Sequence, residues 1–269
     1  MSADSGGRVA VVTGGARGIG AACAERFARE GWTAAVLDVD DALGRSVAEG
    51  IAARGGKAVY RHCDVADAAA VEDAAAWVER DLGPAGVLVT SAALIPNSES
   101  ILDMDMEAHD RLWRVNYHGT LHACRSFGRP MAARRAGAIV TVCSINTMLP
   151  LPLPAYNPGK AALARLTQLL AVELGRVRVR VNAVAPTYVM TPALQARIDA
   201  GQRDLGRMMA THALDVLPVP EDVANAVAFL CSDQASAITG VMLPVDSGWG
   251  AAVSYKTYAG GVPWKDEAG

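Results

Sequence analysis

The chain has 269 residues, 51% of them apolar and 20% charged, and its formal net charge is −3 at neutral pH. This length allows one or two domains, and the apolar share is enough for a core packed between layers of secondary structure. So small a net charge, with dispersed basic residues, provides no field that would attract nucleic acid or an anionic membrane. No apolar run reaches the roughly 20 residues that span a bilayer.

The five cysteines are an odd number without paired spacing. Such a count favours reduced thiols over a disulfide framework, so we expect a cytoplasmic protein. Residues 1–7 are short and polar, and we expect them to be flexible and not to act as a targeting signal.

In chain order, apolar strands alternate with helices from end to end. The predicted strands are Val9–Thr13, Ala34–Asp38, Ala58–Cys63, Val87–Thr90, Ala138–Ser144, Val179–Val184 and Met242–Asp246. The predicted helices are Ile19–Glu30, Ala42–Arg54, Ala68–Asp81, Glu107–Ala133, Ala155–Leu174 and Glu221–Ser232. Most of these strands are apolar throughout, which is typical of strands covered on both faces. The alternation predicts an α/β fold over residues 1–269: one domain with a doubly wound parallel sheet of about seven strands, whose ligand sites lie beyond the strand carboxyl ends.

The first strand is followed by the run Thr13-Gly14-Gly15-Ala16-Arg17-Gly18-Ile19-Gly20 and then by a helix. In such a turn Gly14 permits the tight bend, Gly18 lets the backbone approach a phosphate, and Gly20 lets the helix pack close to the strand. The free N–H groups at the helix start then face the anion. A glycine turn alone also occurs in loops and helix caps that bind nothing, but this context predicts a bound dinucleotide.

The second strand ends at Asp38, roughly 20 residues beyond the glycines, where a carboxylate accepts hydrogen bonds from the adenosine ribose. A 2′-phosphate about 4 Å away would be repelled by about 4 kcal/mol at an effective dielectric constant of 20, so we expect NAD rather than NADP. Arg17 can in principle bind a 2′-phosphate, but no basic residue follows Asp38 to assist it. The alternative is that Asp38 only caps the next helix. Asp64 and Val65 end another strand and either bracket the adenine ring or form an ordinary turn.

Tyr156 and Lys160 are four residues apart at a predicted helix start, so they share one face. A phenol is almost fully protonated at neutral pH. Tyr156 can therefore exchange a proton there only if its phenolate is stabilised, which the Lys160 ammonium would do. Ser144 ends the preceding strand and can hold the reacting oxygen beside Tyr156. A tyrosine and a lysine four apart are common in helices, so this pair is informative only in combination with the other motifs.

In combination, these motifs resemble the short-chain dehydrogenase/reductase family over essentially the whole chain. The family's Thr-Gly-x-x-x-Gly-x-Gly pattern is complete at Thr13, Gly14, Gly18 and Gly20, and its catalytic Asn, Ser, Tyr and Lys match Asn116, Ser144, Tyr156 and Lys160. The segment 180–186 matches the strand beneath the nicotinamide. The resemblance implies a Rossmann-type fold, NAD as cofactor, an Asn116 backbone that holds a relay water, and a homotetramer paired through long helices.

The resemblance and the motifs together assign the site residues. The cofactor contacts are Gly14, Arg17, Gly18, Ile19, Gly20, Asp38, Asp64, Val65, Ser91, Ala92, Tyr156, Lys160, Pro186, Val189 and Thr191; the substrate contacts are Ser144, Asn146, Tyr156 and Thr187. No metal is expected: His118 and His122 are four apart but have no third ligand nearby, so polar packing explains them better. Cys143 lies in an apolar strand without a base, which favours a core residue over a nucleophile.

Two changes from the family pattern bear on the site. Thr90-Ser91-Ala92-Ala93 replaces Asn-Asn-Ala-Gly, and Ala93 has less backbone freedom than glycine, so the turn beside the cofactor can differ. Pro158-Gly159 replaces Ala-Ser before the lysine, which a first helical turn tolerates.

Residues 187–216 are expected to form a substrate lid. Their polar side chains, His212 among them, either contact a small polar alcohol such as a sugar or polyol, including an anionic one held by an arginine, or simply face water. Residues 248–269 form an aromatic-rich tail, expected either to fold over an active site (its own or a neighbour's) or to pack between subunits. Two alternatives stay open: an NADPH-dependent 3-oxoacyl thioester reductase, and a non-catalytic dinucleotide-binding regulatory protein.

Overall fold

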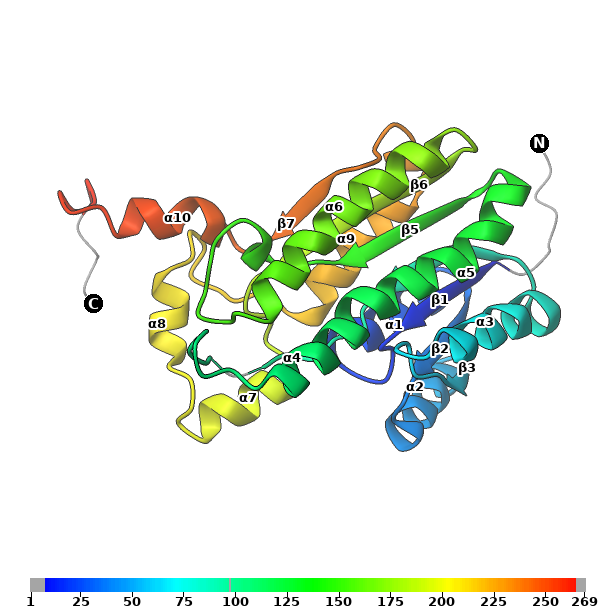
Figure 1. Cartoon of the computed structure of the whole chain (residues 1–269), viewed down its shortest axis with the longest axis horizontal. Coiled ribbons are helices and arrows are strands. Elements are labelled where there is room, and N and C mark those ends of the chain that lie inside the picture. The colour runs from blue at the N-terminus through cyan, green and yellow to red at the C-terminus, as the bar shows by residue number, and fades with distance from the viewer. Residues whose placement is uncertain (1–7, 97, 265–269) are drawn as a thin grey trace.

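Seven parallel strands form one sheet in the order β3-β2-β1-β4-β5-β6-β7 (Figure 1). They are β1 (Val9–Thr13), β2 (Thr33–Asp38), β3 (Lys57–His62), β4 (Ala85–Thr90), β5 (Gly137–Val142), β6 (Val179–Pro186) and β7 (Met242–Val245). The computed structural model describes residues 8–96 and 98–264. The expected flexibility of residues 1–7 therefore lies outside the described residues, as do the last five residues of the tail.

The helices complete the doubly wound arrangement. They are α1 (Gly18–Arg29), α2 (Asp41–Ala53), α3 (Ala68–Trp77), α4 (Met106–Trp113), α5 (Gly119–Arg134), α6 (Tyr156–Gly175), α7 (Pro192–Asp199), α8 (Leu205–Ala210), α9 (Pro220–Cys231) and α10 (Trp249–Lys256). Two π-helical stretches, η1 (Val78–Leu82) and η2 (Arg114–His118), and two 3₁₀ turns, η3 (Ile145–Thr147) and η4 (Asp233–Ala235), join them. Among the described helices, none is both long and apolar enough to cross a membrane.

Alternate residues of each strand pack into two cores, one on each face of the sheet. On β1, Ala10 and Val12 join the core formed with α1 and α9, whereas Val9 and Val11 join the core formed with α3, α5 and α6. All four side chains are fully buried. This two-sided burial explains why the sequence shows continuous apolar runs and no polar alternation.

The strand order reverses at β1, which pairs with β2 on one side and with β4 on the other. At such a reversal the helices following the two strands go to opposite faces, leaving a crevice beyond the carboxyl ends. Figure 1 shows α7, α8 and α10 beyond this end of the sheet. All seven predicted strands and four of the six predicted helices are confirmed, whereas π-helical stretches interrupt the predicted helix Glu107–Ala133 and end the predicted helix Ala68–Asp81. The helices α7, α8 and α10 are additions that the sequence pattern did not indicate.

The predicted helix Glu107–Ala133 is wrong as a single α-helix, because the π-helical turn η2 interrupts it at residues 114–118. The side chain of Asn116 within η2 hydrogen-bonds the backbone of Leu94, with Oδ1 accepting from the amide at 2.7 Å and Nδ2 donating to the carbonyl at 3.0 Å. A π-helical turn adds one residue without breaking the helix, and such turns recur at functional sites.

Candidate active site

The glycine turn between β1 and α1 is packed so closely that Gly14 and Gly20 have no room for a side chain. A Cβ on Gly20 would lie 2.0 Å from the Gly14 carbonyl oxygen, and one on Gly14, whose φ is +67°, would lie 2.5 Å from the backbone of Ala92. The first contact confirms that Gly20 permits close helix packing. The second shows that Gly14 also makes room for the chain leaving β4, which the sequence pattern did not reveal.

The start of α1 lacks the side-chain cap that most other helices in this chain have. Asp40, Asp67, Asp105, Thr191 and Asp204 each accept an N-terminal amide hydrogen bond at α2, α3, α4, α7 and α8 respectively. At α1 the N-cap residue Arg17 makes no such bond, and the first turn holds no acidic residue. These amides and the positive end of the helix dipole are therefore available for an anion, as a dinucleotide diphosphate requires.

Asp38 at the end of β2 is tied to the glycine turn. Its Oδ2 accepts from the Ala16 amide at 3.0 Å, and its Oδ1 accepts from the Asp40 amide at 3.1 Å. The side chain is partly exposed and each carboxylate oxygen retains a free lone pair, so it can still accept from ribose hydroxyls. Asp40, and not Asp38, caps α2, so the reading of Asp38 as a simple helix cap is wrong.

The other expected cofactor residues lie around the same crevice. Thr191 comes close to the turn, since its methyl carbon is 3.4 Å from a Cβ placed on Gly18. The Ser91 amide donates to the Thr13 carbonyl at 3.1 Å, which joins the ends of β4 and β1. Pro186 ends β6, Val189 is buried behind it, and Ile19 is half-buried in the first turn of α1. These positions fit a dinucleotide laid across the strand ends.

Asp64 and Val65 have structural roles that sequence reasoning left open. The Asp64 carboxylate is exposed and accepts from the Ala66 amide at 2.9 Å, as in an ordinary turn. Val65 is buried against Gly119, and its carbonyl oxygen lies 3.0 Å from Nδ1 of His122. His122 is thus engaged by the backbone, and the described residues contain no cluster of three or more metal-ligating side chains.

The turn after β4 accommodates its unusual sequence without strain. Among the described residues, the non-glycine residues with positive φ are Arg135, Arg178 and Ser247, so Ala93 keeps an ordinary backbone. Thr90, in the family's asparagine position, has its hydroxyl buried without a hydrogen-bond partner in the described chain. A buried orphan hydroxyl at this strand end is a group that a bound molecule can satisfy.

Ser144, Tyr156 and Lys160 come together at the carboxyl end of β5. Tyr156 begins α6, and Lys160 lies one turn later with its Nζ 5.4 Å from the centre of the Tyr156 ring. The Lys160 ammonium donates to the Val142 carbonyl at 2.6 Å and is only 3% exposed. Such a long side chain is rarely buried unless it is held, and here the strand end fixes its charge beside the phenol.

Ser144 follows β5 and is 8% exposed. Its hydroxyl oxygen accepts from the Asn146 amide at 3.2 Å and caps η3. An accepting hydroxyl keeps its proton to donate, so Ser144 can hold an oxygen of a bound molecule. Asn146 is buried and Thr187 half-buried near the same strand ends.

Cys143 precedes Ser144 but lies on the core side. Its thiol is 2% exposed, and burial raises its pKa above the usual range. A protonated, covered thiol is not a nucleophile, so the interpretation of Cys143 as a core residue agrees with its position. All five cysteines are free thiols.

The lid and the tail pack against each other, which sequence reasoning missed. The Ser247 carbonyl accepts from the amides of Ala213 and Leu214, both at 3.0 Å, and Lys256 of α10 donates to the His212 carbonyl. His212, expected among the polar groups of the lid surface, is completely buried. Its Nδ1 bonds the Met208 carbonyl at 2.7 Å, so it closes the lid and does not face solvent.

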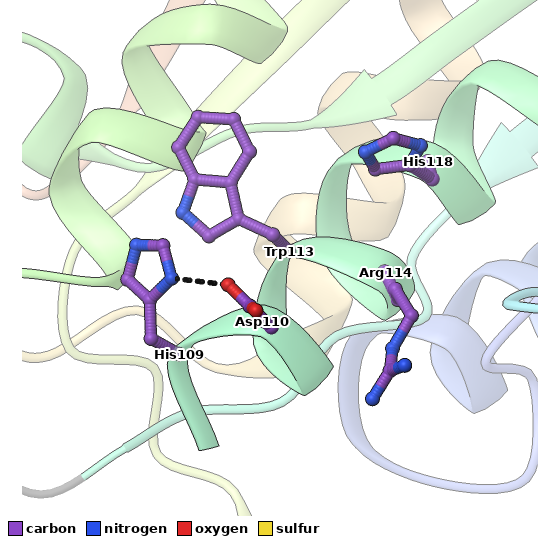
Figure 2. Close-up of a pocket in the computed structure, with 5 residues that line it drawn as sticks. All are labelled: His109, Asp110, Trp113, Arg114 and His118. Carbon is purple, nitrogen blue, oxygen red and sulfur yellow. Dashed lines mark hydrogen bonds and ion pairs between the residues drawn. The ribbon is translucent and has the colours of Figure 1, made fainter. Parts of the chain in front are cut away.

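A hollow lies beside α4 and η2, and one of its lining residues, Trp113, packs against the cluster that contains Tyr156. It has a volume of about 410 Å³ and is lined by His109, Asp110, Trp113, Arg114 and His118 (Figure 2). Within it the rings of His109 and Trp113 stack with their centres 5.9 Å apart. None of the expected catalytic residues is among the residues that line it.

An α/β fold with a free helix N-terminus at the strand reversal and a lysine held beside a tyrosine is that of a dinucleotide-dependent enzyme. The family model described as enoyl-(acyl carrier protein) reductase matches residues 14–250. The chain belongs to the short-chain dehydrogenase/reductase family and is an oxidoreductase of the NAD(P)-dependent kind.

Individual relatives cover nearly the full length. The chain is 40% identical to a probable short-chain type dehydrogenase/reductase of Bradyrhizobium diazoefficiens over 264 residues, covering 95% of this chain and 91% of that protein. It is 36% identical to galactitol 2-dehydrogenase of Rhizobium johnstonii over 246 residues, covering 90% of this chain and 95% of that protein.

Solved structures agree with this placement. A Brucella melitensis protein described as ribose-5-phosphate isomerase superposes with a TM-score of 0.89 at 39% identity, covering 98% of this chain and 100% of that one. An NAD⁺-bound xylitol dehydrogenase superposes with a TM-score of 0.84 at 27% identity, covering 90% of this chain and 99% of that one. Other similar structures hold NAD in one case and NADPH in another.

Proposed function

We propose that this oxidoreductase is an NAD-dependent dehydrogenase of small polar secondary alcohols, most suitably a sugar or polyol, and a carbonyl reductase in reverse. The observation that carries the proposal is the buried ammonium of Lys160, held by the Val142 carbonyl 5.4 Å from the Tyr156 ring. A buried positive charge stabilises a neighbouring phenolate, and this is the condition under which a tyrosine transfers protons at neutral pH.

The chain's own residues then divide the proton chemistry among them. Ser144 donates to the substrate oxygen and orients it toward Tyr156, and Tyr156 takes the hydroxyl proton in oxidation or returns it in reduction. Lys160 stabilises the charge that develops on the phenol oxygen. Nicotinamide, when bound, accepts or supplies the hydride. Asn116, clamped to Leu94 within η2, positions the backbone for the relay of that proton toward solvent.

Asp38 favours NAD as the cofactor. Its carboxylate stands at the end of β2 with lone pairs free for the ribose hydroxyls, and a 2′-phosphate there would meet a like charge. The glycine turn, the open start of α1, Ser91, Ala92, Pro186, Val189 and Thr191 would hold the rest of the dinucleotide, with Asp64 and Val65 beside the adenine.

The polar lid supports a polar substrate. The relatives include a galactitol 2-dehydrogenase, and the similar structures include a xylitol dehydrogenase. Asn146 and Thr187 would add hydroxyl contacts near Ser144. Several lid charges have structural tasks, since Gln195 pairs with Asp199 at 2.7 Å and Asp204 caps α8. An anionic substrate would therefore depend on Arg197 or Arg207.

The long helices offer a surface for a cytoplasmic homotetramer. On α6, Leu169 is 62% and Val172 is 76% exposed. Apolar side chains on one exposed helix face are a sign of an oligomer contact, and the hollow of Figure 2 lies on the neighbouring α4 and η2. Light scattering coupled to gel filtration would measure the state, and Val172→Glu would lower it if this face is the contact.

We propose that the described part of the tail, residues 248–264, forms the outer wall of its own active site. Gly250 of α10 lies close to Ile145 of η3, since a Cβ on it would be 3.2 Å from the Ile145 side chain, and Ile145 directly follows Ser144. The Tyr255 and Trp264 rings stack with centres 5.5 Å apart and stay half-exposed. Truncation after Ser247 should alter turnover and substrate range, and an unchanged enzyme would refute this role.

The deciding experiment is a screen of sugars, polyols and hydroxy acids with NAD⁺, followed by NADH absorbance. Oxidation of a polyol that Tyr156→Phe abolishes, while NAD⁺ still binds, supports the proposal and excludes a non-catalytic regulator. Acids outperforming neutral sugars would support the anionic substrate. A clear preference for NADPH and 3-oxoacyl thioesters would instead favour the reductase, an activity named for a similar Brucella melitensis structure at 29% identity.

A further inference from the structure

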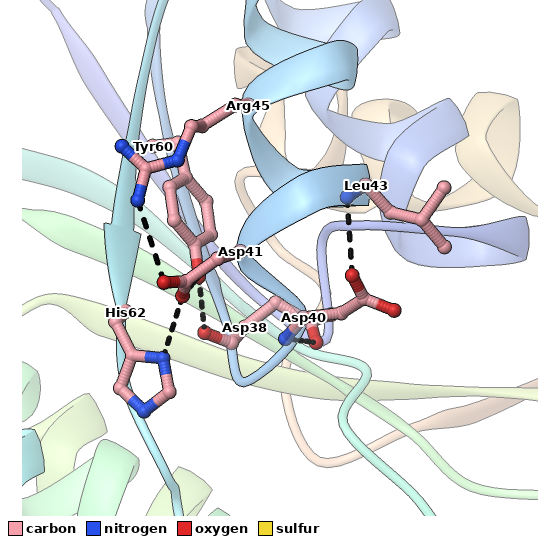
Figure 3. Close-up of polar contacts among 7 residues, drawn as sticks. All are labelled: Asp38, Asp40, Asp41, Leu43, Arg45, Tyr60 and His62. Atoms are coloured by element: carbon pink, nitrogen blue, oxygen red, sulfur yellow. Dashed lines mark hydrogen bonds and ion pairs between the residues drawn. The ribbon is translucent and has the colours of Figure 1, made fainter.

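The three carboxylates that follow β2 have different partners, although all lie at one end of the sheet (Figure 3). Asp38 is braced by the amides of Ala16 and Asp40 and keeps lone pairs free for a ligand. Its backbone carbonyl also accepts from the Tyr60 hydroxyl at 2.9 Å. Asp38 is thus the carboxylate prepared for the ribose, and the other two are engaged elsewhere.

Asp40 uses its two oxygens for two different contacts. Oδ1 accepts from the Leu43 amide at 3.1 Å and caps α2, and Oδ2 forms an ion pair with Arg17 at 2.5 Å. Arg17 is the cation within the glycine turn, one residue beyond the amide that Asp38 holds. The arginine nearest the ribose end of the site is therefore already paired with a carboxylate.

Asp41 pairs with a different arginine, Arg45 of α2, which lies outside the glycine turn. Its carboxylate accepts from Tyr60 at 2.7 Å, lies 2.7 Å from Nδ1 of His62 and pairs with Arg45 at 3.3 Å. The hydrogen bond from Tyr60, followed by that from His62, lowers the pKa of this carboxyl. It stays ionised at neutral pH and retains Arg45.

We propose that Asp40 is a specificity-determining residue that excludes NADP by occupying Arg17. A 2′-phosphate entering this site meets the charge of Asp38, and the guanidinium that would neutralise it is held by Asp40. Arginine binds phosphate and carboxylate with the same paired N–H donors, so the two compete directly. This inference rests on the proposed use of NAD. It assigns the discrimination between NAD and NADP to Asp38 and Asp40 together and not to Asp38 alone.

Asp40→Asn is the test variant, because the amide oxygen still caps α2 while the negative charge is removed. Binding of NAD⁺ and NADP⁺ is measured calorimetrically, without substrate, for wild type, Asp40→Asn and the double variant Arg17→Met/Asp40→Asn. We expect Asp40→Asn to tighten NADP⁺ binding by about tenfold, the scale of one arginine–phosphate contact near the surface, and to change NAD⁺ binding less than about twofold. The double variant should lose the gain.

Asp41→Asn is the matched control, since it removes the same charge one residue away and releases Arg45 instead; it should leave the ratio of the two affinities unchanged. Arg17→Met alone provides a test that does not depend on α2 being capped, and it should barely weaken NADP⁺ binding because Arg17 is not available in the wild type.

An unchanged NADP⁺ affinity in Asp40→Asn, or a gain that survives in the double variant, would overturn the inference. So would a wild type that binds NADP⁺ as tightly as NAD⁺. Because no turnover is measured, failure of the proposed alcohol chemistry leaves these results readable. Conversely, if Asp40→Asn gains no NADP⁺ affinity, a wild type that still prefers NAD⁺ continues to support the proposed use of NAD.

Discussion

Replacing Lys160 by methionine should separate catalysis from stability. The side chains have similar length, so Lys160→Met removes the charge without opening a cavity. The ammonium lies 5.4 Å from the centre of the phenol ring, and Coulomb's law at that separation with an effective dielectric constant of 20 gives about 3 kcal/mol for its attraction to a negative charge. That energy corresponds to about two orders of magnitude in the rate of a step that places negative charge on the phenol.

The assay compares turnover of the best polyol from the screen at several pH values. We expect Lys160→Met to lose turnover on the order of a hundredfold at pH 7, within the range of general acid–base catalysis.

Stability should respond less, because methionine removes the cost of burying a charge, which offsets the loss of the hydrogen bond to the Val142 carbonyl. The midpoint of urea unfolding should therefore stay close to that of the wild type. Wild-type turnover at pH 7 in a correctly folded Lys160→Met variant would refute the assigned role of the ammonium.

Three further changes test other parts of the structure. Gly20→Ala should cost about 1–3 kcal/mol of unfolding free energy and weaken NAD⁺ binding, because its Cβ would meet the Gly14 carbonyl at 2.0 Å. Gly175→Ala is the control in the same urea and binding titrations, since Gly175 has open space around it. Asn116→Ala removes both hydrogen bonds to Leu94 and should cost about 1–3 kcal/mol together with turnover, whereas full activity at normal stability would contradict the clamp. Burial lowers the pKa of His212. As the pH falls below about 6.5, this histidine is therefore protonated in the unfolded chain before it is protonated in the folded one, and the free energy of unfolding decreases. Urea titrations from pH 7.5 to 5 should show a smaller decrease in His212→Asn, and an identical decrease would exclude His212 as a source of the pH dependence.

Much of the fold was predictable because its signals are local. Continuous apolar runs mark strands buried on both faces. The positive φ of Gly14 and Gly18 and the close packing at Gly20 favour glycine at these positions. The π-helical turn at Asn116 was not predictable, since its cause is a contact with Leu94, 22 residues away. The helices α7 and α10 have weak amphipathic patterns. The segments that follow α8 and precede α10 hold each other through long-range contacts, as the hydrogen bonds from the Ala213 and Leu214 amides to the Ser247 carbonyl illustrate.

The sequence by itself determined the alternation of elements, the glycine turn, the carboxylate at the end of β2 and the tyrosine–lysine pair, because each depends on short-range spacing along the chain. Only the tertiary structure decided what these groups contact. In the folded chain, Lys160 is buried and donates to the Val142 carbonyl, His212 is enclosed between lid and tail, and Arg17 forms an ion pair with Asp40. Burial and charge pairing depend on residues that are distant in sequence, so they are defined only when the sheet brings the strand ends together.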